Sequence, residues 1–111
     1  MRIRTQDYNN ITVIEMQGEF EADCAEQFRS TITSAVGPAK NGIILDMTNV
    51  SFIDSKALEE LLWSRDYCIQ TNRQLKLAGL DETCEKILEL TRLREQFERF
   101  SEPAEAVKSF A

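Results

Sequence analysis

Short segments rich in β-branched residues open this chain, and their pattern predicts a β-hairpin. Residues 2–8 and 11–17 contain these segments and flank Asn9-Asn10. Asparagine tolerates a positive φ, which a two-residue hairpin turn requires, so the two segments are expected to pair across a tight turn. Gly18 is expected to end the second strand.

An amphipathic segment follows and predicts the first helix. Asp23 and Glu26, three residues apart, form an acidic variant of the capping-box pattern at its start. Gly37-Pro38 is expected to end this helix. The apolar residues that share one of its faces are Phe28, Ile32 and Val36.

Residues 42–47 form a short apolar run without alternation, which is typical of a strand buried on both faces. We expect a loop through Thr48-Asn49 and then a second helix from Ser55 to about Thr71. The apolar stripe of this helix consists of Leu58, Leu61, Leu62 and Ile69, with Cys68 at its margin.

The second half of the chain continues the alternation of strand and helix. Residues 75–79 alternate as a strand, and Asp81 is expected to cap a short helix. Residues 97–100 fit an edge strand and a helix equally well, and Glu102-Pro103 is expected to start a last helix. The apolar faces of these two helices are formed by Cys84, Ile87 and Leu88, and by Ala106, Val107 and Phe110.

The elements therefore run in the order β-β-α-β-α-β-α-(β)-α, which predicts the α/β fold class. An N-terminal hairpin followed by alternating units gives a small mixed β-sheet of four to five strands, covered by about four helices. The chain has 111 residues, no internal repeat and no long linker, so a single domain over residues 1–111 is expected.

The charge balance excludes several classes of partner. Thirteen Lys and Arg residues stand against 19 Asp and Glu residues, a net charge of −6, and Arg92 and Arg94 lie among glutamates. Such a surface repels nucleic-acid backbones and anionic lipids. No apolar run approaches the roughly 20 residues that cross a bilayer, and residues 1–5 lack the apolar core of a secretory signal. We expect a cytoplasmic protein that binds no nucleic acid and does not insert into membranes.

The cysteines and the absence of histidine limit the catalytic groups and metal sites that the chain can form. Cys24, Cys68 and Cys84 are widely spaced, match no zinc or CxxC pattern and fall on apolar helical faces. They are interpreted as free core thiols in a reducing compartment. The absence of histidine removes Ser-His and Cys-His nucleophile pairs and every His-based metal site. Neither a metal nor another cofactor is expected, and no Gly-rich phosphate loop is present.

The strongest candidate site lies in residues 43–58. There a buried strand leads through a polar loop to Asp54 and Ser55, where the second helix begins. Helix N-termini carry unpaired N–H groups and partial positive charge, which favour oxygen ligands. Two interpretations follow. Asp54 or Ser55 serves only as a helix cap, or Ser55 presents its hydroxyl to solvent for a functional purpose.

Other candidate residues have competing interpretations. Asp46 ends a strand as a receiver phosphoacceptor does, but the acidic pair and the lysine that receivers also need are absent. A small enzyme that uses Asp46, Asp54 and Ser55 would have no base or metal beside the serine. Trp63 lies about 140° from Leu58 around the helix, off the apolar stripe. It is either a partner contact or packed under a neighbouring loop.

Residues 43–58 resemble the signature of the STAS domain family (sulfate transporter and anti-sigma-factor antagonist). The family pattern is an apolar strand that ends in Asp, a short loop, and then apolar-Asp-Ser-Ser/Thr-Gly-Leu. It corresponds here to Leu45-Asp46 and to Ile53-Asp54-Ser55-Lys56-Ala57-Leu58. In the same way, Gly18-Glu19-Phe20-Glu21 resembles the Gly-x-Leu-Asp after the family's second strand, and Leu77-Ala78-Gly79-Leu80 resembles the strand and loop before its third helix. The similarity extends over nearly the whole chain.

This resemblance implies a partner switch. Single STAS domains of this length are similar to bacterial anti-sigma factor antagonists, which bind an anti-sigma factor that is also a serine kinase and so free a sigma factor for transcription. The kinase phosphorylates the antagonist with ATP and releases it, and a separate serine phosphatase resets the cycle. By position, Ser55 is the phosphoacceptor, and the protein itself is not an enzyme. The partner-binding residues that the resemblance implies are Glu21, Asp23, Asp54, Ser55, Lys56 and Ala57.

The chain departs from the family motif at three of these positions. Lys56 replaces the second hydroxyl residue, Ala57 replaces a glycine and Glu21 replaces an aspartate. Alanine favours a helix over glycine by about 1 kcal/mol, so the fold is expected to tolerate Ala57, although its methyl group would crowd a kinase that packs its backbone there.

A second interpretation retains the STAS fold but involves no phosphorylation switch. Some STAS proteins similar to this one are constitutive subunits, for instance docked on the ATPase of a lipid transporter, and Ser55 would then be only a cap.

Overall fold

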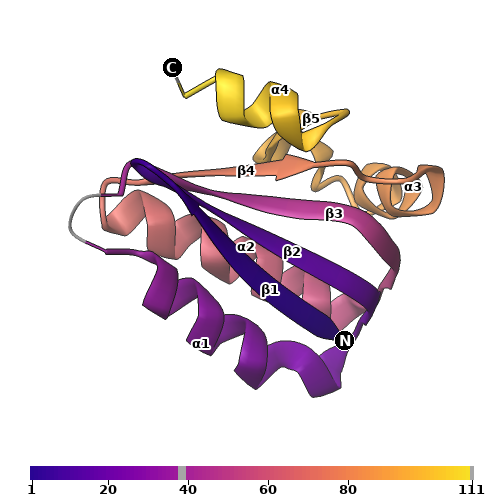
Figure 1. Cartoon of the computed structure of the whole chain (residues 1–111). Helices are drawn as coiled ribbons and strands as arrows, with labels where there is room; N and C mark the ends of the chain where they lie inside the picture. Colours follow the sequence, from indigo (N-terminus) through magenta and orange to yellow (C-terminus); the bar gives the residue numbers. More distant parts are fainter. Residues whose placement is uncertain (38–39, 111) are drawn as a thin grey trace.

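A five-stranded mixed sheet with the order β1-β2-β3-β4-β5 forms the centre of the molecule. The computed structural model describes residues 1–37 and 40–110 (Figure 1). The strands are β1 (Arg2–Tyr8), β2 (Ile11–Phe20), β3 (Gly42–Ile53), β4 (Gln74–Ala78) and β5 (Glu98–Phe100). The helices are α1 (Ala25–Ala35), α2 (Ser55–Gln70), α3 (Glu82–Leu90) and α4 (Pro103–Lys108), with the 3-10 turns η1 (Ala22–Cys24) and η2 (Arg94–Gln96). β1 and β2 pair antiparallel and the other neighbours pair parallel, so the predicted fold class is confirmed.

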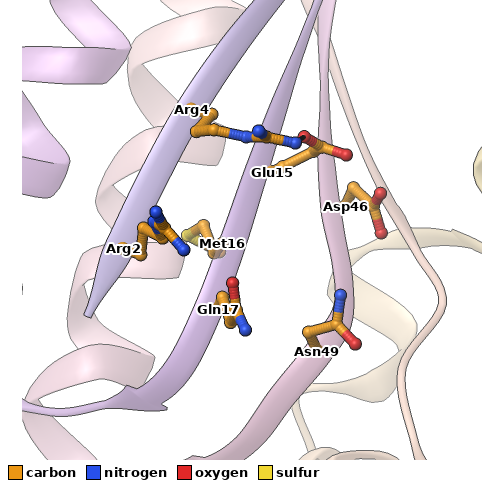
Figure 2. A pocket seen from close by; sticks show the side chains of 7 residues that line it. All are labelled: Arg2, Arg4, Glu15, Met16, Gln17, Asp46 and Asn49. Atoms are coloured by element: carbon orange, nitrogen blue, oxygen red, sulfur yellow. Dashed lines mark hydrogen bonds and ion pairs between the residues drawn. The ribbon is translucent and has the colours of Figure 1, made fainter.

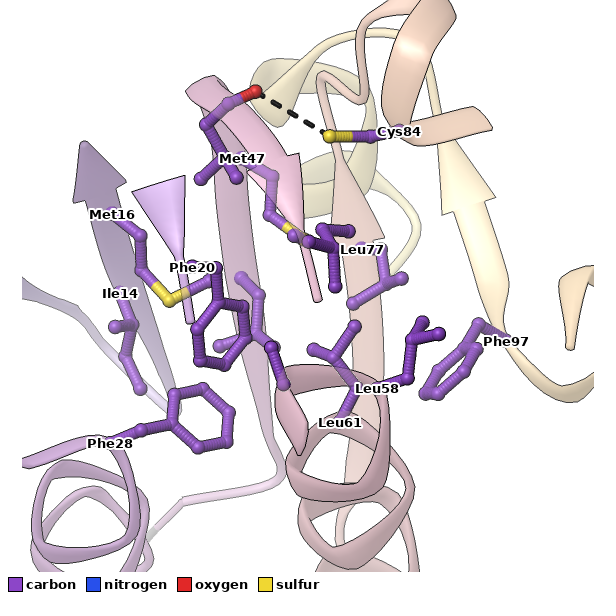
Figure 3. Packing of buried hydrophobic residues seen from close by; sticks show 14 of the residues in the cluster. Ile14, Met16, Phe20, Phe28, Met47, Leu58, Leu61, Leu77, Cys84 and Phe97 are labelled. Carbon is purple, nitrogen blue, oxygen red and sulfur yellow. Dashed lines mark hydrogen bonds between the residues drawn. The ribbon is translucent and has the colours of Figure 1, made fainter. Parts of the chain in front are cut away.

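The helices cover the two faces of the sheet unequally. α1 and α2 lie side by side along one face, and α4 covers part of the other (Figure 1). The main core fills the space beneath α1 and α2 and includes Ile14, Met16, Phe20, Phe28, Met47, Leu61 and Leu77 (Figure 3). A smaller cluster lies beneath α4 and consists of Ile11, Val13, Ile44, Ala78 and Ala106. Among the described residues, we find no helix with both the length and the apolar character that crossing a membrane requires.

The two central strands are longer than the sequence pattern indicated. Gly18 does not end β2, and the predicted loop through Thr48-Asn49 is wrong, because both segments continue as paired strands as far as Phe20 and Ile53. Gly18 has a φ of 114° and lies next to an irregularity in the pairing register. A glycine adopts this φ without the steric cost that a side chain would add, so the strand bends here and then continues. The extension carries β2 and β3 to the start of α2.

Two predicted helix boundaries need correction. Asp23 does not cap α1, because it lies inside η1 and makes no side-chain capping bond. Val36 lies beyond the end of α1 and is only partly buried. The predicted stop at Gly37-Pro38 falls partly outside the described residues. Asp81, by contrast, caps α3 as predicted, since its carboxylate accepts a 2.8 Å hydrogen bond from the Cys84 backbone N–H.

The core face of α2 also differs from prediction at one end. Cys68 is completely buried, whereas Ile69 is 55% exposed. At 100° per residue, Cys68 lies within about 20° of Leu61 around the helix, whereas Ile69 lies about 80° from Leu61. Cys68 therefore faces the core in place of Ile69. All three cysteines are buried and free, as predicted. Burial raises the pKa of Cys68 to about 11 and that of Cys84 to about 12, so both remain neutral thiols at physiological pH.

Candidate functional site

The N-terminus of α2 presents the Ser55 side chain to solvent. Asp54 is the N-cap, and its Oδ1 accepts a 2.8 Å hydrogen bond from the Ala57 backbone N–H. Ser55 is the first helical residue and is exposed, and its hydroxyl makes no hydrogen bond to any residue that the structure describes. Capping therefore belongs to Asp54, and the Ser55 oxygen remains available for another use.

Asp54 also connects this helix to the segment that follows β2. Its second oxygen, Oδ2, accepts a 3.0 Å hydrogen bond from the Ala22 backbone N–H, and its own N–H donates to the Phe20 carbonyl at 3.1 Å. One carboxylate thus joins the starts of η1 and α2. As a result, Glu21 and Asp23 lie on the segment anchored beside Ser55, although more than 30 residues separate them along the chain.

Acidic side chains gather around this anchor. The pKa of Glu21 is raised, first by a hydrogen bond shared with the Glu19 side chain, then by partial burial and by the negative charges of Glu19, Asp23 and Asp54. We call Glu19, Glu21, Asp23 and Asp54 the acidic cluster. No group of potential ligands within the described chain has the arrangement of a metal site.

Lys56 and Ala57 complete the segment that the family motif covers. Lys56 is exposed, and its ammonium lies 3.5 Å from the Glu59 carboxylate one turn along α2. Ala57 is completely buried and belongs to the main core, so its methyl group does not reach the surface. Of the six predicted site residues, the structure therefore places five at or near the surface around the helix start and one beneath it.

Asp54 gives a stability prediction with a matched control. We expect Asp54→Ala to lower the free energy of unfolding by about 2 kcal/mol, because it removes a helix cap and the bond to Ala22 together. Asp81→Ala removes a helix cap alone and should cost about 1 kcal/mol. Urea denaturation of both variants measures the difference. Equal losses would show that the bond to Ala22 adds nothing in solution.

Asp46 lies away from this site. Its Oδ1 accepts hydrogen bonds from the backbone N–H of Thr48 at 3.1 Å and from the hydroxyl of Thr48 at 2.6 Å. It lines a small polar pocket of about 50 Å³ with Arg2, Arg4, Glu15, Met16, Gln17 and Asn49 (Figure 2). Along β3, Asp46 alternates with Leu45 and Met47, which face α1 and α2, so it points to the opposite side of the sheet. An enzyme that needs Asp46 beside Ser55 has no support in this geometry.

Trp63 contacts side chains of α1 and α2. Its ring stacks on Tyr67 with a centroid separation of 5.2 Å, and the Arg29 guanidinium of α1 lies 4.5 Å above it. The charge run Glu59-Glu60 predicts a solvated face, but Glu60 is buried because its carboxylate pairs with Arg29, which lies 31 positions away along the chain. The only local signal was the spacing of Glu60, Trp63 and Tyr67 at intervals of three and four residues.

Comparison with known proteins gives consistent results. The model of the STAS domain family matches residues 2–106. A STAS-domain containing protein of Pseudomonas aeruginosa (strain UCBPP-PA14) is 31% identical over 85 residues, which cover 76% of this chain and 82% of the relative.

Solved structures agree on the fold. The anti-sigma factor antagonist SpoIIAA in its unphosphorylated form superposes with a TM-score of 0.82 at 21% identity, covering 98% of this chain and 96% of that one. A sulfate transporter family protein from Wolinella succinogenes superposes with a TM-score of 0.81 at 18% identity, covering 90% and 84%. At these identities the likeness establishes the fold, which the two proteins share despite their different names.

Proposed function

Since this chain belongs to the STAS domain family, we propose that it is an anti-sigma factor antagonist whose binding to its partner is controlled at Ser55. In this proposal residues 1–111 form one cytoplasmic domain without enzymatic activity. The partner is an anti-sigma factor of the serine-kinase type, and binding it releases a sigma factor for transcription. No nucleic acid, cofactor or membrane takes part.

The observation that carries the proposal is the free hydroxyl of Ser55. It stands exposed at the start of a 16-residue helix whose cap is already supplied by Asp54. Modification of this oxygen therefore removes no capping bond and displaces no core side chain. The unpaired N–H groups and the dipole at the helix start favour an added phosphate locally, so we expect the fold to survive phosphorylation.

The proposed cycle has two chemical steps, and both are catalysed by partners. The kinase transfers the γ-phosphoryl group of ATP to the Ser55 Oγ, ADP leaves, and the hydroxyl proton passes to a base of the kinase. The phosphatase uses water to cleave the phosphate ester, which releases inorganic phosphate and restores the hydroxyl. Around this oxygen, Glu21, Asp23, Asp54 and Lys56 form the charged surface that we expect the partner to contact.

Phosphorylation assays with a panel of the host's purified anti-sigma factor kinases test the proposal. We expect one kinase to bind the protein and, with ATP, to add a single phosphate that peptide mapping by mass spectrometry locates at Ser55. Ser55→Ala should block the reaction. Ser51→Ala, which removes an exposed serine of neighbouring β3, should leave it unchanged. Phosphate at another position, or no reaction with any kinase of the panel, would refute the proposal.

A constitutive subunit of a transporter complex is the second candidate. The structural likeness to a sulfate transporter family protein favours it, as does the ion pair that Lys56 makes where the motif has a second hydroxyl. In that case both Ser55→Ala and Ser55→Asp would leave the complex intact in pulldown experiments. The two candidates therefore differ in the binding of Ser55→Asp, which the switch weakens and the constitutive subunit tolerates.

A further inference from the structure

A buried carboxylate holds Arg29 in a fixed position between α1 and α2. The Arg29 Nε lies 2.7 Å and 2.9 Å from the two carboxylate oxygens of Glu60. The Glu60 side chain is only 2% exposed, whereas that of Arg29 is 47% exposed. This hydrogen bond raises the pKa of Arg29 above its already high value, so the guanidinium is permanently charged. Within the described chain, the terminal amino groups of Arg29 make no hydrogen bond.

Two aromatic rings extend this arrangement into a three-layer stack. The Arg29 guanidinium lies 4.5 Å from the centroid of Trp63, which in turn stacks on Tyr67 at 5.2 Å with an interplanar angle of 17°. Both rings are partly buried and pack against the main core. Each group is therefore held by its neighbours before any partner arrives, which lowers the side-chain entropy that binding would cost. We call Arg29, Trp63 and Tyr67 the α1–α2 stack.

The stack is continuous with the surface around Ser55. Lys56, Glu60, Trp63 and Tyr67 follow one another at spacings of four, three and four residues, which places them on one side of α2. Lys56 directly follows Ser55, and Trp63 lies about 12 Å from Ser55 along the helix axis. A protein that docks on the start of α2 and covers a surface of ordinary size would reach the stack.

We propose that the α1–α2 stack is a second contact area for the anti-sigma factor that binds at Ser55, and that an Asp or Glu side chain of this partner occupies it. The inference rests on the proposed function. The free amino groups of Arg29 offer a planar pair of donors, which matches a carboxylate. Trp, Tyr and Arg are also the residues that most often contribute strongly to the affinity of an interface.

Charge complementarity then determines the orientation of the partner. The acidic cluster lies at the start of η1 and α2, and the half-exposed guanidinium of Arg29 lies over Trp63, two turns farther along α2. A partner that places Lys or Arg against the acidic cluster and a carboxylate against Arg29 fits in one direction only. Reversing it would bring like charges together at both ends.

The single tryptophan of the chain allows a direct test. Labelling with 5-fluorotryptophan gives one 19F resonance, from Trp63, which unlabelled kinase cannot obscure. We expect this resonance to shift when the kinase of the panel that binds the protein is added, in step with complex formation measured by gel filtration.

An unchanged resonance in a complex that forms would overturn the inference and leave the function of Ser55 untouched. Failure of every kinase to bind would refute the proposed function and this inference with it. A shift that depends only on the protein's own concentration would assign the stack to a second copy and also overturn the inference.

A pair of conservative variants separates binding from packing. Arg29→Lys keeps the charge but loses the planar donors and the flat contact with Trp63, and we expect it to weaken kinase binding at least tenfold. Arg65→Lys makes the same change on α2 outside the stack and should alter affinity less than twofold. Thermal unfolding of both variants identifies any loss of affinity that is due to instability. Equal affinities of the two lysine variants would overturn the inference.

Discussion

Replacing Ser55 with aspartate is expected to lower the affinity for the proposed anti-sigma factor partner more than a hundredfold, a loss of about 3–4 kcal/mol. The cause is local. In the proposed cycle Ser55 must reach the γ-phosphate of ATP in the kinase, so the docked hydroxyl would lie close to the phosphates of the nucleotide. A carboxylate at this position meets those charges and is buried without a counter-ion.

The surroundings of Ser55 in this chain increase the effect. The pKa of Glu21 is raised first by its hydrogen bond with Glu19 and by partial burial, and the negative charges of Glu19, Asp23 and Asp54 add to the shift. Aspartate adds one charge to them, and a phosphate adds about −1.5 to −2 at pH 7. The phosphorylated protein should therefore bind more weakly than Ser55→Asp. Lys56 offsets little of this charge, since it already pairs with Glu59.

Isothermal titration calorimetry with the purified kinase measures the change in affinity. Ser55→Ala should bind within about threefold of the wild type, because the hydroxyl makes no bond that the alanine loses. Ser51→Asp serves as the charge control, since it adds the same carboxylate to an exposed serine of β3. If Ser55→Asp and Ser51→Asp weaken binding equally, net charge and not the position of Ser55 explains the effect, and the switch is wrong.

Local rules account for the elements that were predicted correctly. The hairpin turn follows from two asparagines, and Asn9 has the expected positive φ of 49°. Asp81 is recognised as a cap by its position before an amphipathic segment. Asp54 and Ser55 could be found in the same way, because a polar pair between a buried strand and an apolar stripe indicates a helix start wherever the rest of the chain lies.

The features that were missed depend on contacts between distant segments. β2 and β3 continue past Gly18 and Asn49 because each strand supplies hydrogen-bond partners to the other. The sequence of either segment alone does not reveal this pairing. The bond from Ala22 to Asp54 spans 32 positions, and that from Arg29 to Glu60 spans 31. The serine was therefore predictable from its own surroundings, and the family resemblance placed Glu21, Asp23 and Asp54 on the same expected surface. The bond that joins their segments and the α1–α2 stack required the tertiary structure.

The largest stability effect is expected at Phe20, which supports the site from below. Its side chain is completely buried and packs on Phe28 with ring centroids 4.9 Å apart, and its carbonyl accepts the hydrogen bond from Asp54 N–H. Phe20→Ala should lower the free energy of unfolding by about 3–5 kcal/mol, since it removes buried apolar surface and leaves a cavity. Domains of this kind are stable by only about 5–15 kcal/mol, so the loss is a large fraction of the total.

Two controls distinguish this packing from a general effect of aromatic residues near the carboxyl ends of β2 and β3. Phe20→Leu keeps most of the volume and should cost less than about 1.5 kcal/mol, consistent with the leucine that the family motif carries at this position. Phe52→Ala removes an aromatic side chain that is 42% exposed near the end of β3, so a loss of about 1 kcal/mol or less is expected. Urea denaturation of the three variants measures the ranking. If Phe20→Ala costs no more than Phe52→Ala, the end of β2 is not anchored in the core, and the rigid presentation of Ser55 that the switch requires loses its physical basis.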